Sequence, residues 1–150
     1  MGWRDWLGRS SKTVVAPRSM LTPFLLEGEE LVEVVGESFY QPALLRQCRA
    51  RRGDPVRFPC RAYLVAQPDN PYDRNAVAVQ IGGQLVGHLS RSEAPRWLPL
   101  VQQLAARGYA ASCEAMIAGR GREGETDHLG VFLHLPTPTE AHAQVAKLAT

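Results

Sequence analysis

The residues best suited to chemistry lie in one polar loop, residues 67–75, between two apolar runs. This loop carries an aromatic ring at Tyr72, a carboxylate at Asp73, a cation at Arg74 and an amide at Asn70. Its two prolines fix their own φ at about −65° and favour extended geometry in the residue before them, and Asp and Asn side chains bond neighbouring backbone amides. The composition therefore predicts a rigid turn that holds a ring and a carboxylate in fixed positions.

Two other segments place similar groups beside predicted strand ends. Ser38, Phe39 and Tyr40 follow an apolar run that ends at residue 36, and His88 and Arg91 lie at the end of another run. Proteins hold single-stranded nucleic acid with aromatic faces that stack on bases and with donors that bind phosphates. The three segments together can supply the parts of such a site.

The aromatic candidates each have a structural alternative. Phe39 and Tyr72 could stack on bases, at about 1–3 kcal/mol per base, or their rings could close the open end of the core. Tyr40 is better suited to a packed position. The sequence leaves both roles open for the first two rings.

The polar candidates are also divided between two roles. Asp73 could accept a hydrogen bond from a terminal sugar hydroxyl, which a continuing phosphodiester would remove, or it could hold the turn through nearby backbone amides. Asn70 suits a structural role because asparagine bonds locally, although it could still reach a nucleotide. His88 alternates with Val86, so it could lie on the outer face of a barrel, where Arg91 would add a phosphate contact, or it could be structural or solvated, as a lone histidine usually is.

The motifs in these segments resemble those of a known family. Residues 70–79 read Asn-Pro-Tyr-Asp-Arg-Asn-Ala-Val-Ala-Val, residues 86–91 read Val-Gly-His-Leu-Ser-Arg, and residues 36–40 read Gly-Glu-Ser-Phe-Tyr. This pattern resembles the HIRAN domain, a module found at the N-terminus of helicase-like transcription factor and as a small free-standing bacterial protein. The resemblance runs from about residue 31 to about residue 135.

This resemblance implies a modified OB-like β-barrel that captures single-stranded DNA, in the best-understood member at the 3′-hydroxyl end. In the relatives that bind DNA ends, the position matching Ser38 is an arginine, which the resemblance implies bonds phosphate or base. Serine at this position removes one charge-assisted contact unless Arg74, Arg91 or an arginine cluster replaces it.

Composition sets limits on the class of protein. A chain of 150 residues fits one domain with a sizeable core. Its net charge of +2 is too small to indicate nucleic-acid binding, so any such binding needs a local patch. The arginines do cluster, either on a solvated loop or along a phosphate track, at Arg46, Arg49, Arg51, Arg52, Arg57 and Arg61.

The cysteines and the apolar runs indicate a compartment. Cys48, Cys60 and Cys113 lack CxxC spacing and predict neither a zinc site nor a disulfide framework. No run of about 18 apolar residues is present, and the first residues lack the apolar core of an export signal. We therefore expect a soluble protein of the reducing cytoplasm with no membrane partner.

The hydrophobic pattern predicts a mainly β domain. We expect a flexible lead over residues 1–28, a barrel domain over residues 29–136 and a tail or short helix over residues 137–150. Within the domain, residues 75–81 and 84–89 form the clearest hairpin, joined by a Gly-Gly turn. Five or six strands with one or two short helices suit a small OB-like or SH3-like barrel, and the choice of a barrel over a sandwich rests partly on the resemblance.

Catalysis has little support in the sequence. The phosphate-binding GxxxxGK[ST] loop, HExxH and GxSxG are all missing. A magnesium site built from Asp69, Asp73, His88 and Asp127 has no supporting spacing, and a zinc site would need distant cysteines to converge. We expect no catalytic residue, no metal and no cofactor.

Two hypotheses about function remain. The first is a non-catalytic module that binds single-stranded DNA, at 3′ ends, in DNA repair, replication or mobile-element processing. The second is a protein-interaction module that uses the same barrel face, with Trp3 and Trp6 as an additional anchor. These two tryptophans lie three residues apart, as one helical turn would place them.

Overall fold

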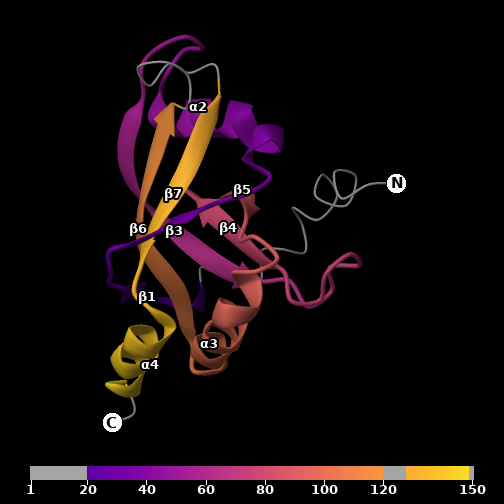
Figure 1. Ribbon diagram of the computed structural model, residues 1–150, viewed down its shortest axis with the longest axis vertical. Coiled ribbons are helices and arrows are strands. Elements are labelled where there is room, and N and C mark those ends of the chain that lie inside the picture. The colour runs from indigo at the N-terminus through magenta and orange to yellow at the C-terminus, as the bar shows by residue number, and fades with distance from the viewer. Residues whose placement is uncertain (1–19, 120–127, 149–150) are drawn as a thin grey trace.

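Strands dominate the computed structural model, which describes residues 20–119 and 128–148 (Figure 1). The strands of the described residues are β1 (Thr22–Leu26), β2 (Glu30–Glu33), β3 (Arg57–Ala66), β4 (Val77–Ile81), β5 (Gln84–His88), β6 (Tyr109–Gly119) and β7 (Leu129–Leu135). The helices there are the 3₁₀-helix η3 (Glu37–Tyr40), α2 (Gln41–Cys48), α3 (Ala94–Ala106) and α4 (Pro138–Ala146). The mainly β prediction is confirmed, with seven strands in the described residues where five or six were expected.

The seven strands form one curled sheet, in which β1 pairs with β6 and the other six follow the order β2-β7-β6-β3-β4-β5 with antiparallel neighbours. The two outer strands of this order meet at a single bridge. Val35, just past β2, pairs with His88 at the end of β5 through two backbone hydrogen bonds of 2.9 Å. The bridge brings the two edges of the curled sheet together.

Glycines make the β4–β5 hairpin and this bridge possible. Gly82 and Gly83 have φ values of 59° and 79°, as a two-residue hairpin turn requires. Gly87 precedes the bridge with a φ of 153°, and a Cβ atom there would lie 2.5 Å from Val34 Cγ1 and 2.6 Å from Val35 O. Any side chain at this position would push the two edges apart.

The core lies inside the curl of the sheet and beneath α3. Alternate residues of the strands point inward, and Leu64, Val79 and Leu133 are almost fully buried. Trp97 and Leu104 on the apolar face of α3 are buried as well. Figure 1 shows α3 and α4 at one end of the barrel and α2 at the other. None of the helices in the described residues has the length and apolar character needed to cross a membrane.

The ordered domain begins earlier than the sequence indicated. Residues expected in the flexible lead form β1, which pairs in parallel with the first half of β6 and buries Leu26 completely. The prediction failed because the partner strand starts far along the chain, at Tyr109, so no local pattern reveals it. At the other end, a capping box between Thr137 and Glu140 opens α4. Trp3 and Trp6 lie outside the described residues.

Candidate functional site

Hydrogen bonds inside the loop of residues 67–75 fix the positions of its ring and its carboxylate. Asn70 is 1% exposed, and its Oδ1 accepts hydrogen bonds from the backbone N–H groups of Tyr72 (2.9 Å) and Asp73 (3.2 Å). Oδ1 of Asp73 accepts one from the N–H of Asn75 at 2.9 Å. Asn70 therefore has the structural role that its residue type indicated, and Asp73 takes part in holding the turn.

Gln67 ties this loop to the end of β5. Its side chain is buried, and its Oε1 lies 2.7 Å from His88 Nε2 and accepts a hydrogen bond of 3.3 Å from Asn70 Nδ2. Because an amide oxygen only accepts, His88 carries its proton on Nε2. The chain Asn70–Gln67–His88 thus links the loop to the strand that meets Val35.

The expectation that His88 lies on the outer face is wrong. Its side chain is 1% exposed, because the bridge to Val35 flanks it on one side and Gln67 covers it on another. Burial lowers the pKa of His88 to about 4, and the nearby carboxylate of Asp73 opposes this shift. At neutral pH the imidazole is therefore uncharged, and it supports the loop rather than supplying a cation for phosphate.

The aromatic side chains of the site divide into two exposed rings and one packed ring. Phe39 is 45% exposed and Tyr72 is 38% exposed. Tyr40 is half-buried, burial raises its pKa, and its hydroxyl oxygen is buried without a hydrogen-bond partner in the described residues. Tyr40 is packed, as predicted, whereas the other two rings are partly exposed to solvent.

The turn that carries Phe39 is fastened to β7. Glu37 is buried, and its Oε1 lies 3.2 Å from His128 Nε2. The Gln41 side chain bonds both backbone groups of Leu129, accepting from its N–H at 2.7 Å and donating to its carbonyl at 2.9 Å. These contacts hold η3 in place and so fix where Phe39 stands.

The bridge between Val35 and His88 joins the three predicted segments at one rim of the barrel. The segment with Ser38 and Phe39 follows Val35, the loop with Tyr72 and Asp73 is tied to His88 through Gln67, and the stretch with Arg91 follows His88 directly. We call this surface the rim site and define it by Ser38, Phe39, Tyr72, Asp73, Arg74 and Arg91. Ser38, Arg74 and Arg91 are exposed, and Asp73 is half-buried.

Sequence reasoning missed the residues that support this rim. Glu37 and Gln67 are buried and Gln41 is half-buried, and nothing in the local pattern around these polar residues indicates this. Only the position of Gln67, directly before the Pro-Asp-Asn-Pro run, associates it with the loop. Their roles come from partners such as His88 and Leu129, which lie far away in the sequence.

The cysteines lie closer together than the sequence indicated. Burial raises the pKa of Cys48 and Cys60 to about 11 and that of Cys113 to about 12. Cys48 contributes to the raised pKa of Cys60, and Cys60 contributes to that of Cys113. All three are free thiols rather than reactive thiolates at neutral pH. Within residues 20–119 and 128–148, no three His, Cys, Asp or Glu side chains gather as a metal site, and Asp127 lies outside those residues.

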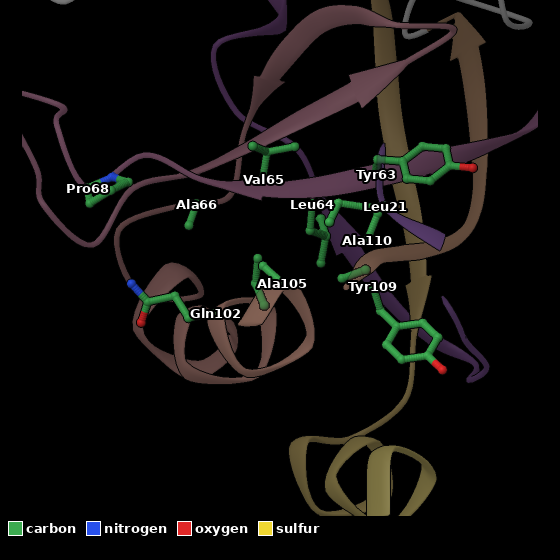
Figure 2. A pocket seen from close by; sticks show the side chains of 12 residues that line it. Leu21, Tyr63, Leu64, Val65, Ala66, Pro68, Gln102, Ala105, Tyr109 and Ala110 are labelled. Atoms are coloured by element: carbon green, nitrogen blue, oxygen red, sulfur yellow. The ribbon is translucent and has the colours of Figure 1, made fainter. Parts of the chain in front are cut away.

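An apolar pocket of about 260 Å³ lies between β3, α3 and the start of β6 (Figure 2), and neither Phe39 nor Tyr72 lines it. Figure 2 shows Val65 and Ala66 of β3 above Gln102 and Ala105 of α3, with Pro68 at one side. Its lining is almost entirely apolar and holds no charged side chain. The pocket is therefore not suited to a phosphate group.

Comparisons with known proteins identify the family. The family model described as the HIRAN domain matches residues 29–130. The crystal structure of the HIRAN domain of human HLTF is similar, with 20% sequence identity and a TM-score of 0.34 over 81% of this chain and 89% of that chain. No curated protein matches this chain. The family match covers most of the chain and agrees with the motifs of residues 36–40, 70–79 and 86–91, so this protein belongs to the HIRAN domain family, whose members are known generally as nucleic-acid-binding modules.

Proposed function

We propose that this protein is a non-catalytic module that binds single-stranded DNA at its 3′ end through the rim site. The observation that carries the proposal is the exposure of two aromatic rings, Phe39 and Tyr72, on turns that hydrogen bonds of Asn70 and Gln41 hold in fixed positions. Such a module would act beside an enzyme in DNA repair, replication or mobile-element processing. The free thiols of the described residues suit a reducing cytoplasm.

The exposed rings are suited to stacking on bases. A large apolar ring at the surface leaves favourable burial unused, and stacking on a base is worth about 1–3 kcal/mol. Stacking does not depend on sequence, because every base has an aromatic face. Two rings on separate turns would therefore bind two nucleotides of any sequence.

Asp73 supports a preference for an end over an internal nucleotide. Its Oδ1 accepts the N–H of Asn75, whereas no hydrogen bond to Oδ2 occurs in the described part of the chain. A carboxylate oxygen can accept a hydrogen bond from a terminal 3′-hydroxyl, and it repels a phosphate in the same place. This oxygen would therefore favour the hydroxyl end.

The phosphate contacts of the rim are modest. Ser38 offers only a hydroxyl where end-binding relatives have an arginine, and the neutral His88 adds no charge. Arg74 and Arg91 are exposed and can form bidentate contacts with phosphate. Stacking and end recognition would thus contribute more to binding at the rim than charge does.

Fluorescence anisotropy with a labelled single strand tests this proposal. Tyr72→Ala should weaken binding by about 5- to 150-fold, the equivalent of 1–3 kcal/mol, with little change in melting temperature. Leu31→Ala is the matched control, because Leu31 is an apolar side chain, 63% exposed, on β2 rather than at the rim. Equal affinity of the two variants would contradict a stacking role, and a large fall in melting temperature would assign Tyr72 to the core instead.

A protein partner is the second candidate for the same surface. Val35 is 39% exposed at the bridge that joins the segments carrying Phe39 and Tyr72, so the rim has an apolar component that a protein could cover. Serine in place of the expected arginine at residue 38 also favours this alternative. If the wild-type protein binds no single strand at low salt, the rim should be tested against protein partners.

A further inference from the structure

Positive charge is concentrated in one part of the chain outside the rim site. Residues 41–61 contain six arginines and one acidic residue, which gives this segment a charge of +5. The remaining residues have eleven basic and fourteen acidic side chains and therefore carry −3. The small net charge of the whole chain conceals this strong separation.

Four of these arginines form no ion pair with an acidic side chain in the described part of the chain. The only acid of the segment, Asp54, uses its Oδ2 to accept the backbone N–H of Arg51 at 2.9 Å. Arg61 lies 3.8 Å from Glu114. Among the described residues no ion pair involves the other exposed arginines, which we call the arginine surface, namely Arg46, Arg49, Arg52 and Arg57.

The arginine surface continues from the rim site. Helix α2 follows η3 directly in the chain, after the non-helical backbone of Tyr40, and its exposed positions include Pro42 and Arg46, with Arg49 at its C-terminal cap. Pro42 and Arg46 lie about one helical turn apart on the exposed side of α2, and Arg49 follows at its cap, so these positions form a stripe along α2 that leads away from η3. Eight residues of α-helix span about 12 Å.

The turn after α2 extends this stripe. Arg52 lies in the exposed turn that Asp54 closes, and Arg57 is exposed at the first position of β3. Figure 1 shows α2 at the end of the barrel opposite α3 and α4. The stripe therefore runs from the rim toward that end of the molecule.

We propose that the arginine surface binds the sugar–phosphate backbone of the strand that leads away from the rim site. This inference rests on the proposed function, because it states where the part of the strand upstream of the bound 3′ end lies on the protein. Exposed guanidinium groups without acidic partners bind phosphates in a bidentate manner and do not read bases. The surface thus adds affinity that depends on strand length and on salt but not on sequence.

Strands of two lengths test this inference, one of about 4 and one of about 12 nucleotides, within the range that one such barrel covers. The double variant Arg46→Gln/Arg49→Gln is compared by titration calorimetry with the double variant Arg96→Gln/Arg107→Gln. The control removes the same charge from exposed arginines of α3 and its cap, where Arg96 bonds Glu93 and Arg107 bonds the carbonyl of Leu148. Circular dichroism and melting temperatures check that both variants are folded.

The Arg46→Gln/Arg49→Gln variant should bind the long strand more weakly than the wild type does, whereas its affinity for the short strand should be almost unchanged. Each lost phosphate contact lowers the slope of log K against log salt by about 0.7 for a single strand, so the first variant should lower it by about 1.4. Between about 50 and about 200 mM salt, the affinity of this variant for the long strand should therefore fall about sevenfold less than that of the wild type. The short strand should bind both variants within about twofold of the wild type.

Two results would overturn the inference and leave the rim proposal intact. One is an equal effect of both double variants on the long strand. The other is an equal loss for the short and the long strand in the Arg46→Gln/Arg49→Gln variant. If the wild-type protein binds neither strand, the proposed function fails, and this inference fails with it.

Discussion

Replacing Asp73 with asparagine separates the charge of this side chain from its role in the turn. The amide oxygen of asparagine can still accept the N–H of Asn75, which Asp73 Oδ1 now accepts at 2.9 Å. The negative charge that would accept a 3′-hydroxyl and repel a 3′-phosphate is lost. The Asp73→Asn variant should therefore keep the fold and lose the preference for a hydroxyl end.

The size of this preference follows from the environment of Asp73. A hydrogen bond to a charged group is worth about 1.5–3 kcal/mol, and about 1.4 kcal/mol corresponds to a factor of ten. Because Asp73 is half-buried, water screens part of this interaction, and the lower end of the range applies. We expect the wild-type protein to prefer the 3′-hydroxyl strand about tenfold and the variant to prefer it less than about twofold.

The assay is fluorescence anisotropy with two strands of the same sequence, one ending in a 3′-hydroxyl and the other in a 3′-phosphate. Asp69→Asn is the matched control, because it removes the same charge from an exposed position in the same loop. The control should keep the tenfold preference. A preference that persists in Asp73→Asn, or disappears equally in Asp69→Asn, would refute the reasoning about the Asp73 carboxylate.

Three further predictions concern the support of the rim. Gln67→Ala should cost about 1–3 kcal/mol in chemical denaturation and weaken binding of the single strand, since Asn70 and His88 both lose their buried partner. The pKa of His88 lies below its unfolded value of 6.5, so the free energy of unfolding should be highest above pH 6.5 and fall by up to about 3 kcal/mol as the pH drops toward 4. The His88→Gln variant should lose most of this pH dependence, whereas the variant of the exposed His142, His142→Gln, should keep it. Gly87→Ala should lower the melting temperature sharply, because its methyl group would overlap the opposite edge of the sheet, and an unchanged melting temperature would contradict this account of the bridge.

Local patterns in the sequence predicted the elements that local contacts define. The β4–β5 hairpin follows from alternating apolar residues around Gly82 and Gly83, whose positive φ values the structure has. The role of Asn70 also follows from residue type, since its partners lie two and three residues later. These features depend on neighbours in the chain, so the sequence carries their signal directly.

Contacts between distant segments account for what the sequence did not reveal. β1 was assigned to the lead because its partner, β6, begins at Tyr109. His88 was expected on the surface because neither Gln67, which bonds it, nor Val35, which pairs with it, is marked by a local pattern. The fastening of η3 by Gln41 was missed for the same reason, as Leu129 is a distant partner.

The most direct test of the rim site is a titration of the isotopically labelled protein with a short single strand, followed by backbone amide chemical shifts. The account predicts that the largest saturable shifts fall on residues 35–40, 67–75 and 88–91. Saturable shifts confined to other elements, such as α3 and α4, or no shifts at all at low salt, would contradict the assignment of this rim as the DNA-binding surface.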